Sequence, residues 1–172
     1  TGGFSALIDL LVEAVIEHLA AQVEAGADAV QIFDSWAGLL SEREAAVWSQ
    51  AQLSRICTGF ALRCPGVPIL LFPRGAPAAV LEALAEDGRA AALSLATEVD
   101  PAWAAEVLQP RVTVQGNLDP QVLVEGGVAL DAAVDRLFET LGGGPWICNL
   151  GHGVVPQTPP EHVARLVERV RR

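Results

Sequence analysis

The chain has 172 residues, of which 51% are hydrophobic and 19% are charged. This composition is typical of a globular domain with a core and excludes a disordered tail and a coiled coil. The net charge of −10 argues against a nucleic-acid partner, because phosphate contacts need clustered basic side chains. No apolar run approaches the roughly 20 residues of a membrane span, and no signal-like segment opens the chain. We therefore expect a cytoplasmic protein without a membrane or nucleic-acid partner.

Helical and strand patterns alternate along the chain. A helical period over 4–25 is followed by a short apolar strand at 29–33. Further strands are predicted at 68–72, 91–96, 112–115 and 146–149, and further helices at 42–62, 78–86, 101–107, 129–141 and 160–172. The strands are continuous apolar runs, as in parallel sheets covered on both faces. The pattern predicts an α/β protein, and its five strands fit either an open doubly wound sheet or part of a (β/α) barrel.

Polar residues gather directly after the predicted strands. They are Asp34 and Ser35, Arg74, Thr97 and Glu98, Asn117 and Asp119, and Asn149 and His152. In a barrel, these positions converge on the mouth where such enzymes keep their active sites. We therefore expect Phe33, Ser35, Asn117 and His152 to lie on one side of a parallel sheet.

His152 is the sharpest candidate for chemistry, because Gly151 and Gly153 flank it in a strand-end loop and let its ring project. The alternative is a loop histidine without a task. Ser35 suits a hydrogen bond to a substrate, and the alternative is that Ser35 or Asp34 simply caps the turn.

Three further strand-end residues have two interpretations each. Asn117 and Asp119 either bind a substrate or hold their own turn, and the turn is the favoured interpretation. Arg74 either meets a carboxylate or is solvated.

His18 and His162 lie on predicted helices, and we expect both on the surface.

Several kinds of site have no signal in the sequence. Glycine-rich phosphate-binding motifs are absent, and the run 142–144 precedes a strand instead of following one. Cys57, Cys64 and Cys148 lack zinc spacing. We expect them to be free thiols and predict no metal site.

Four ordered segments resemble the uroporphyrinogen decarboxylase family. They are GADAVQIFDSWAG at 26–38, VPILLFPRG at 67–75, GNLDP at 116–120, and NLGHGV with the following prolines, Thr158 and Glu161 at 149–161. The resemblance implies a cytoplasmic, homodimeric (β/α)8 TIM barrel that converts uroporphyrinogen III to coproporphyrinogen III by removing four acetate carboxyl groups. It implies no metal or organic cofactor, because a protonated pyrrole accepts the electrons of the breaking bond. By motif, Phe33 lines the cleft, Ser35 contacts the substrate, and His152 binds a carboxylate or assists proton transfer.

The chain departs from the family pattern in two places. Only Thr97 remains of an Asp-Trp-Thr-like triplet at 95–97, and the chain has no Tyr. The family's N-terminal part, with its arginine-rich loop, pyrrole-binding Asp and substrate-contacting Tyr, is missing. We therefore expect residues 1–172 to be the C-terminal portion of a single barrel domain that lacks three strands.

Two alternatives stay open. The first is a corrinoid-linked methyltransferase of the same superfamily, which would bind zinc near Cys148 and His152. The second is a truncated, non-catalytic partial barrel.

Overall fold

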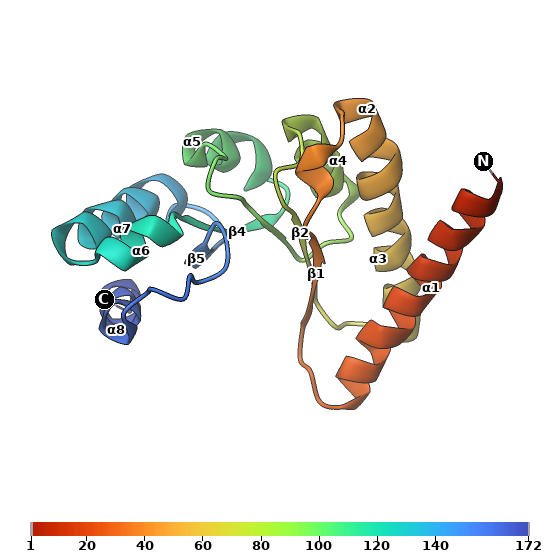
Figure 1. Cartoon of the computed structure of the whole chain (residues 1–172), viewed down its shortest axis with the longest axis horizontal. Helices are drawn as coiled ribbons and strands as arrows, with labels where there is room; N and C mark the ends of the chain where they lie inside the picture. Colours follow the sequence, from red (N-terminus) through yellow and green to blue (C-terminus); the bar gives the residue numbers. More distant parts are fainter. Residues whose placement is uncertain (1, 172) are drawn as a thin grey trace. The chain divides into compact units, whose positions relative to one another are not determined.

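The computed structural model describes residues 2–171 and contains five strands that alternate with helices (Figure 1). The strands are β1 (Val30–Asp34), β2 (Ile69–Pro73), β3 (Ala92–Ser94), β4 (Thr113–Leu118) and β5 (Trp146–Leu150). The helices are α1 (Gly2–Glu24), α2 (Glu42–Ala45), α3 (Ala51–Arg63), α4 (Ala78–Asp87), α5 (Pro101–Trp103), α6 (Pro120–Glu125), α7 (Gly127–Leu141) and α8 (Pro160–Val170), with short turns η1 (Ala37–Leu39), η2 (Ala46–Gln50) and η3 (Ala104–Leu108). The chain forms two compact units, of which the first ends at Ala92 and the second begins at Leu93.

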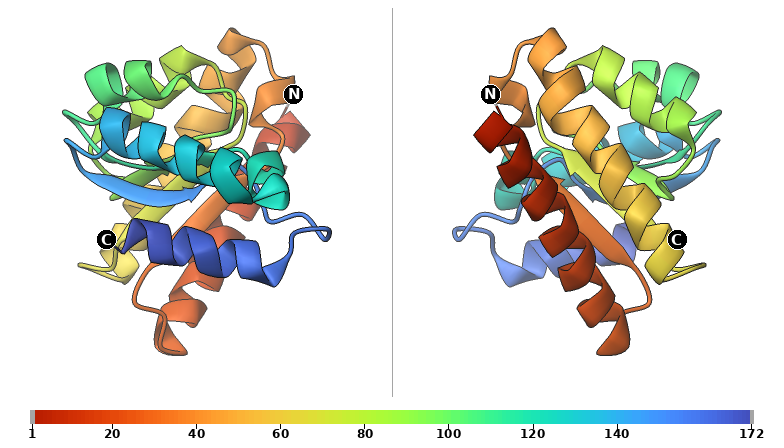
Figure 2. Two further views of the ribbon diagram at one scale, coloured as in Figure 1. Left: turned by 90° about the vertical axis from the view of Figure 1, so that its left-hand side faces the viewer. Right: turned by 90° about the vertical axis from the view of Figure 1, so that its right-hand side faces the viewer.

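In the first unit, β1 and β2 pair in parallel, with Val30 opposite Ile69 and Asp34 opposite Pro73. Helices α1 and α3 lie side by side (Figure 2, right). Gly59 permits this close packing, because a Cβ on it would lie 2.4 Å from Cδ1 of Ile16. Apolar side chains of the strands and helices form the core of this unit: Ile16, Leu19, Leu53, Phe60, Ile69, Leu71, Val80 and Leu84.

The helix predicted at 42–62 is present as the consecutive segments α2, η2 and α3. Its start is fixed by a capping box: the Ser41 side chain accepts a hydrogen bond from Glu44 N, and the Glu44 carboxylate accepts one from Ser41 N. The middle segment, η2, is a π-helical turn. A π turn keeps the helix axis continuous, so the prediction of one long helix is confirmed.

In the second unit, β4 and β5 pair in parallel, with Asn117 opposite Asn149. The end of β3 joins β4 through a 2.8 Å hydrogen bond from Leu95 N to Gln115 O. The core of this unit is again apolar: Leu93, Leu108, Val114, Leu123, Leu130, Val134 and Leu141.

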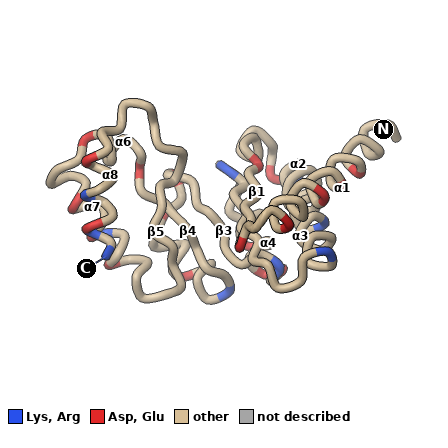
Figure 3. Tube along the Cα trace, turned by 90° about the horizontal axis from the view of Figure 1, so that it is seen from below, with Lys and Arg blue, Asp and Glu red and all other residues tan. Residues whose placement is uncertain are grey.

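Helix α8 lies beside α7 (Figure 2, left) and contributes no buried residue. Charged residues of both signs line this pair of helices (Figure 3). Arg165 donates to Asp131 at 2.9 and 2.6 Å, and Arg169 donates to Asp135. These two-pronged ion pairs connect the two helices.

The structure differs from the predicted elements mainly around β4. The strand continues through Gly116–Leu118, where a turn was expected, because these residues pair with 148–150 of β5. Helix α6 was not predicted. Within residues 2–171, none of the helices combines the length and apolar character that a membrane span requires.

Candidate functional site

The ends of β1 and β2 are joined closely in the first unit. Arg74 N donates to Asp34 O, and Gly38 N donates to Arg74 O, both at 3.0 Å. A Cβ on Gly38 would lie 2.8 Å from the carbonyl oxygen of Gly75, which itself has a φ of +69°. Glycine is therefore needed on both sides of this contact, which holds the two strand-end loops together.

An aromatic surface lies on these loops. The Phe33 side chain is 63% exposed and meets Phe72 edge to face at a centroid distance of 6.0 Å. Trp36 is also exposed, and the Arg74 guanidinium carbon lies 5.9 Å from the centroid of its ring. Exposed aromatic faces beside a cation suit a flat ligand that carries carboxylates.

Ser35 stands between Phe33 and Trp36 in the chain and is exposed. The turn around it is held by its neighbour, because Asp34 Oδ1 accepts a 3.4 Å hydrogen bond from Trp36 N. Of the two predicted roles, the turn therefore falls to Asp34. The position of Ser35 remains compatible with a hydrogen bond to a ligand.

In the second unit, the ends of β3, β4 and β5 meet at Gly151. Gly151 N donates to Leu118 O at 2.8 Å. A Cβ on Gly151 would lie 2.4 Å from Thr97 N, so no larger residue fits there. This contact fixes the start of the loop that carries His152.

His152 itself is exposed, as its glycine-flanked position predicted. Its Nδ1 accepts a 2.7 Å hydrogen bond from Gly153 N. An accepting Nδ1 places the proton of a neutral imidazole on Nε2. A neutral ring in this geometry is therefore a hydrogen-bond donor at Nε2.

Asp119 has the local turn-holding role favoured by the sequence, whereas that expectation is wrong for Asn117, which lies in β4 and bonds carbonyl groups of another segment. The Asn117 amide donates to Ala96 O at 3.0 Å and to Val99 O at 2.7 Å. Asp119 caps α6, because its Oδ1 accepts a 2.8 Å hydrogen bond from Gln121 N. Both side chains tie the end of β4 to its surroundings.

The other two histidines lie away from these loops. His18 is exposed, as predicted. The prediction that His162 is a surface residue is wrong, because its ring is half-buried with Nδ1 3.0 Å from Leu123 O. It packs over Gly126, where a Cβ would lie 2.3 Å from the ring.

The three cysteines are free thiols, as predicted. Burial raises the pKa of Cys57 to about 11 and also raises the pKa of Cys148. Among residues 2–171, no three His, Cys, Asp or Glu side chains form a group that could hold a metal ion.

The candidate residues divide between the two units. Phe33 and Ser35 lie in the first, and Asn117 and His152 lie in the second. That all four lie on one side of a sheet stays a prediction. Sequence reasoning missed Trp36 as a member of the exposed aromatic surface, although it stands in the strand-end motif at 26–38.

Comparison with known proteins identifies the sequence family. The model of the uroporphyrinogen decarboxylase (URO-D) family matches residues 2–172. Proteins named uroporphyrinogen decarboxylase from Rhodospirillum rubrum and Rhizorhabdus wittichii are 49% and 48% identical to this chain, with 98% of the chain covered in each case. The matches cover 48% and 49% of those proteins. The chain therefore spans about half the length of the curated relatives it matches.

Among solved structures, a methyltransferase from Methanosarcina mazei has a similar fold. The TM-score is 0.75 at 24% identity, over 94% of this chain and 47% of that one. At this identity the likeness concerns the fold alone. Together with the family match, it confirms the predicted fold class, an α/β partial barrel of the TIM type with five parallel strands.

Proposed function

Since this chain belongs to the uroporphyrinogen decarboxylase family, we propose that it forms part of an enzyme that converts uroporphyrinogen III to coproporphyrinogen III. The observation that carries this proposal is the family match over residues 2–172. Because the chain spans about half the length of its relatives, we assign residues 1–172 to the C-terminal portion of a single barrel domain. The principal acid and the main carboxylate-binding arginines then belong to the other portion.

The proposed reaction removes one CO₂ from each of four acetate side chains. A protonated pyrrole ring accepts the electron pair of the breaking C–C bond, CO₂ leaves, and a proton then converts the exocyclic carbon to a methyl group. The ring finally returns its added proton. This route needs no metal or organic cofactor, because the substrate is its own electron sink. The protein has to bind the carboxylates, position each acetate in turn and move protons.

Residues of the first unit are suited to binding the macrocycle. The exposed ring of Phe33 offers a flat apolar surface for a pyrrole. Ser35 supplies a hydroxyl two residues along the chain, and Arg74 supplies a guanidinium beside Trp36. A guanidinium and a carboxylate form a strong, charge-assisted hydrogen bond, so we assign Arg74 to a peripheral carboxylate of the substrate.

We assign His152 either to bind a carboxylate of the substrate or to pass a proton during turnover. The bond from Gly153 N to Nδ1 leaves Nε2 as the proton-bearing atom of the neutral ring. A donor at this position would hold an acetate or propionate carboxylate, or pass on a proton during turnover. We call His152 a substrate-positioning residue with an accessory part in proton transfer.

We further propose that the complete enzyme is a cytoplasmic homodimer acting on a small-molecule substrate. The acidic balance of the chain supports a partner other than nucleic acid. Light scattering of the complete enzyme tests the dimer, and a monomer at micromolar concentration would contradict it.

A chimera tests the proposed activity. The 168-residue segment of the Rhodospirillum rubrum protein that matches this chain would be replaced by the chain itself. The folded chimera should convert uroporphyrinogen to coproporphyrinogen, as measured by chromatography of the oxidised porphyrins. The unaltered relative is the positive control. A folded chimera without turnover would contradict the assignment.

A non-catalytic partial barrel is the second candidate. The chimera separates the two candidates. An active chimera shows that the residues of this chain support catalysis. An inactive chimera that keeps a cooperative fold favours the non-catalytic alternative.

A further inference from the structure

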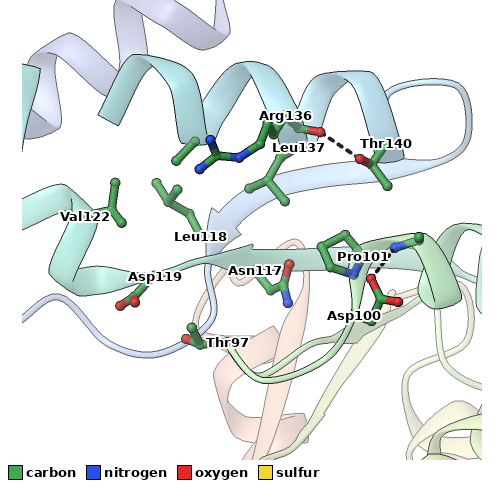
Figure 4. A pocket seen from close by; sticks show the side chains of 12 residues that line it. Thr97, Asp100, Pro101, Asn117, Leu118, Asp119, Val122, Arg136, Leu137 and Thr140 are labelled. Atoms are coloured by element: carbon green, nitrogen blue, oxygen red, sulfur yellow. Dashed lines mark hydrogen bonds between the residues drawn. The ribbon is translucent and has the colours of Figure 1, made fainter. Parts of the chain in front are cut away.

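The second unit contains a cavity of about 370 Å³ next to the end of β4 (Figure 4). Residues from the loop after β3 and from β4, α5, α6 and α7 line it, and its apolar lining residues are Pro101, Ala102, Leu118, Val122, Ala133 and Leu137. Neither Phe33 nor Ser35 nor His152 lines this cavity. Its volume is within the range of small-molecule pockets.

Asn117 supplies the polar group that the fold leaves without a partner in this wall. The residue is only 5% exposed, and its amide nitrogen donates to Ala96 O and Val99 O. Because both amide hydrogens are engaged, the side-chain orientation is fixed. Its Oδ1 is buried and has no hydrogen-bond partner within residues 2–171. Figure 4 shows this oxygen pointing from β4 toward Leu137.

A buried acceptor without a donor is costly, so native structures almost always satisfy such an atom. A ligand that carries an N–H group would satisfy Asn117 Oδ1 and place its apolar body against Leu118 and Leu137. The two carboxylates of the wall are engaged elsewhere: Asp100 and Asp119 each accept a backbone hydrogen bond at the start of a helix. They disfavour a ligand with more than one negative charge.

A cation stands on the opposite wall. Arg136 extends from α7 beside Leu118 and Val122 (Figure 4). The next turn of α7 carries Thr140, whose hydroxyl donates to Arg136 O at 2.8 Å. The wall therefore combines a buried acceptor, an apolar surface and a guanidinium.

We propose that this cavity binds a small aromatic monocarboxylate with a ring N–H. The N–H would donate to Asn117 Oδ1, the ring would pack on Leu118 and Leu137, and the carboxylate would meet Arg136. None of the residues that the proposed decarboxylation uses, Phe33, Ser35, Arg74 and His152, lines this cavity, so either proposal can fail without the other.

The test uses three related probes on the purified 172-residue chain. Indole-3-acetate has both recognition groups, 1-methylindole-3-acetate lacks the N–H, and indole-3-acetamide lacks the charge. Titration followed by NMR should show saturable binding of indole-3-acetate, with shifts of the Asn117 side-chain amide signals. 1-Methylindole-3-acetate should bind about three- to tenfold more weakly, the range expected for one hydrogen bond. Indole-3-acetamide should bind about two- to fivefold more weakly, because Arg136 is exposed and an ion pair with an exposed side chain is screened by water.

Two variants and a control complete the test. Arg136→Gln should remove the preference for the acid over the amide, and Ala133→Leu should fill the cavity and abolish binding. Arg43→Gln removes an exposed arginine of the first unit and should change nothing. Absence of saturable binding, or equal affinity for the three probes, would overturn the proposal. If the isolated chain associates, the same titration is made on the chimera, where the same results support or overturn the proposal.

Discussion

Gly151, after β5, lies directly against the backbone of Thr97, after β3. A Cβ on Gly151 would lie 2.4 Å from Thr97 N, 2.5 Å from Thr97 Oγ1 and 2.7 Å from Thr97 Cα. Because two of these atoms belong to the backbone, a side-chain rotation cannot relieve the clash. This contact joins two strand ends that are 54 residues apart by position (151 minus 97).

Replacing Gly151 with Ala should therefore destabilise the protein. Overpacking of a close contact costs about 1–3 kcal/mol, and we expect the free energy of unfolding to fall by that amount. Urea denaturation followed by tryptophan fluorescence measures it. Gly153→Ala is the matched control, because a Cβ there has no atom within 4 Å. Equal losses for the two variants would contradict the role of the contact.

His152→Asn should lower kcat/KM about ten- to hundredfold in the active chimera. Asn keeps a donor but removes the titratable ring, and a lost hydrogen bond to a charged group is worth about 1.5–3 kcal/mol. Partly decarboxylated intermediates should accumulate, because each step must dock a different acetate. Steady-state kinetics with product analysis measures both effects. Complete inactivation with an intact fold would instead make His152 the essential acid, and an unchanged rate would make it an ordinary loop residue.

The isolated chain should show little or no decarboxylation of uroporphyrinogen. In the proposal, the principal acid and most carboxylate-binding arginines belong to the other portion of the barrel. Large apolar side chains are also exposed in the chain, among them Leu10 at 66% and Leu39 at 79%, so we expect self-association. Chromatographic product analysis and light scattering check the two expectations. Robust turnover by the 172-residue chain would show that the assignment of the missing groups is wrong.

Stability should fall in alkaline solution because of Cys57. Its pKa is about 11 in the folded chain, above the ordinary value of 9.0, so the folded state holds its proton more tightly than the unfolded state. The stability that the protonated Cys57 thiol contributes is complete below pH 9, and it is lost as the pH rises from 9 to about 11. The slope from one such thiol is at most about 1.4 kcal/mol per pH unit.

The composition makes this pH window unusually simple. The chain contains neither Lys nor Tyr, so cysteines are the side chains that ordinarily titrate there. Urea denaturation at pH 8.5, 9.5 and 10.5, values chosen to bracket roughly the range between the two pKa values, should show a shallower decline for Cys57→Ala. That variant is less stable below pH 9, where the thiol is protonated in both states, because it leaves a cavity. Parallel curves for the two proteins would contradict the assignment.

The sequence by itself determined the order of the elements and the class of fold. Continuous apolar runs at 69–72 and 146–148 form parallel strands in the structure. β2 is buried along most of its length, as a strand covered on both faces should be, whereas β5 contains no buried residue. Proline at the first turn also marked the start of α5 and α8. Such signals lie within a few consecutive residues, so they can be recognised without the tertiary structure.

Tertiary structure alone decided which polar groups are engaged. β4 continues through Gly116–Leu118 because β5 pairs with it, although the local sequence favours a turn. Asn117 bonds carbonyl groups about 20 residues earlier in the chain, and His162 packs over Gly126. These contacts join residues distant in sequence, and their geometry depends on how the strands and helices pack. The local sequence therefore does not predict these contacts. The strand-end positions of Ser35 and His152, by contrast, could be predicted directly from the sequence.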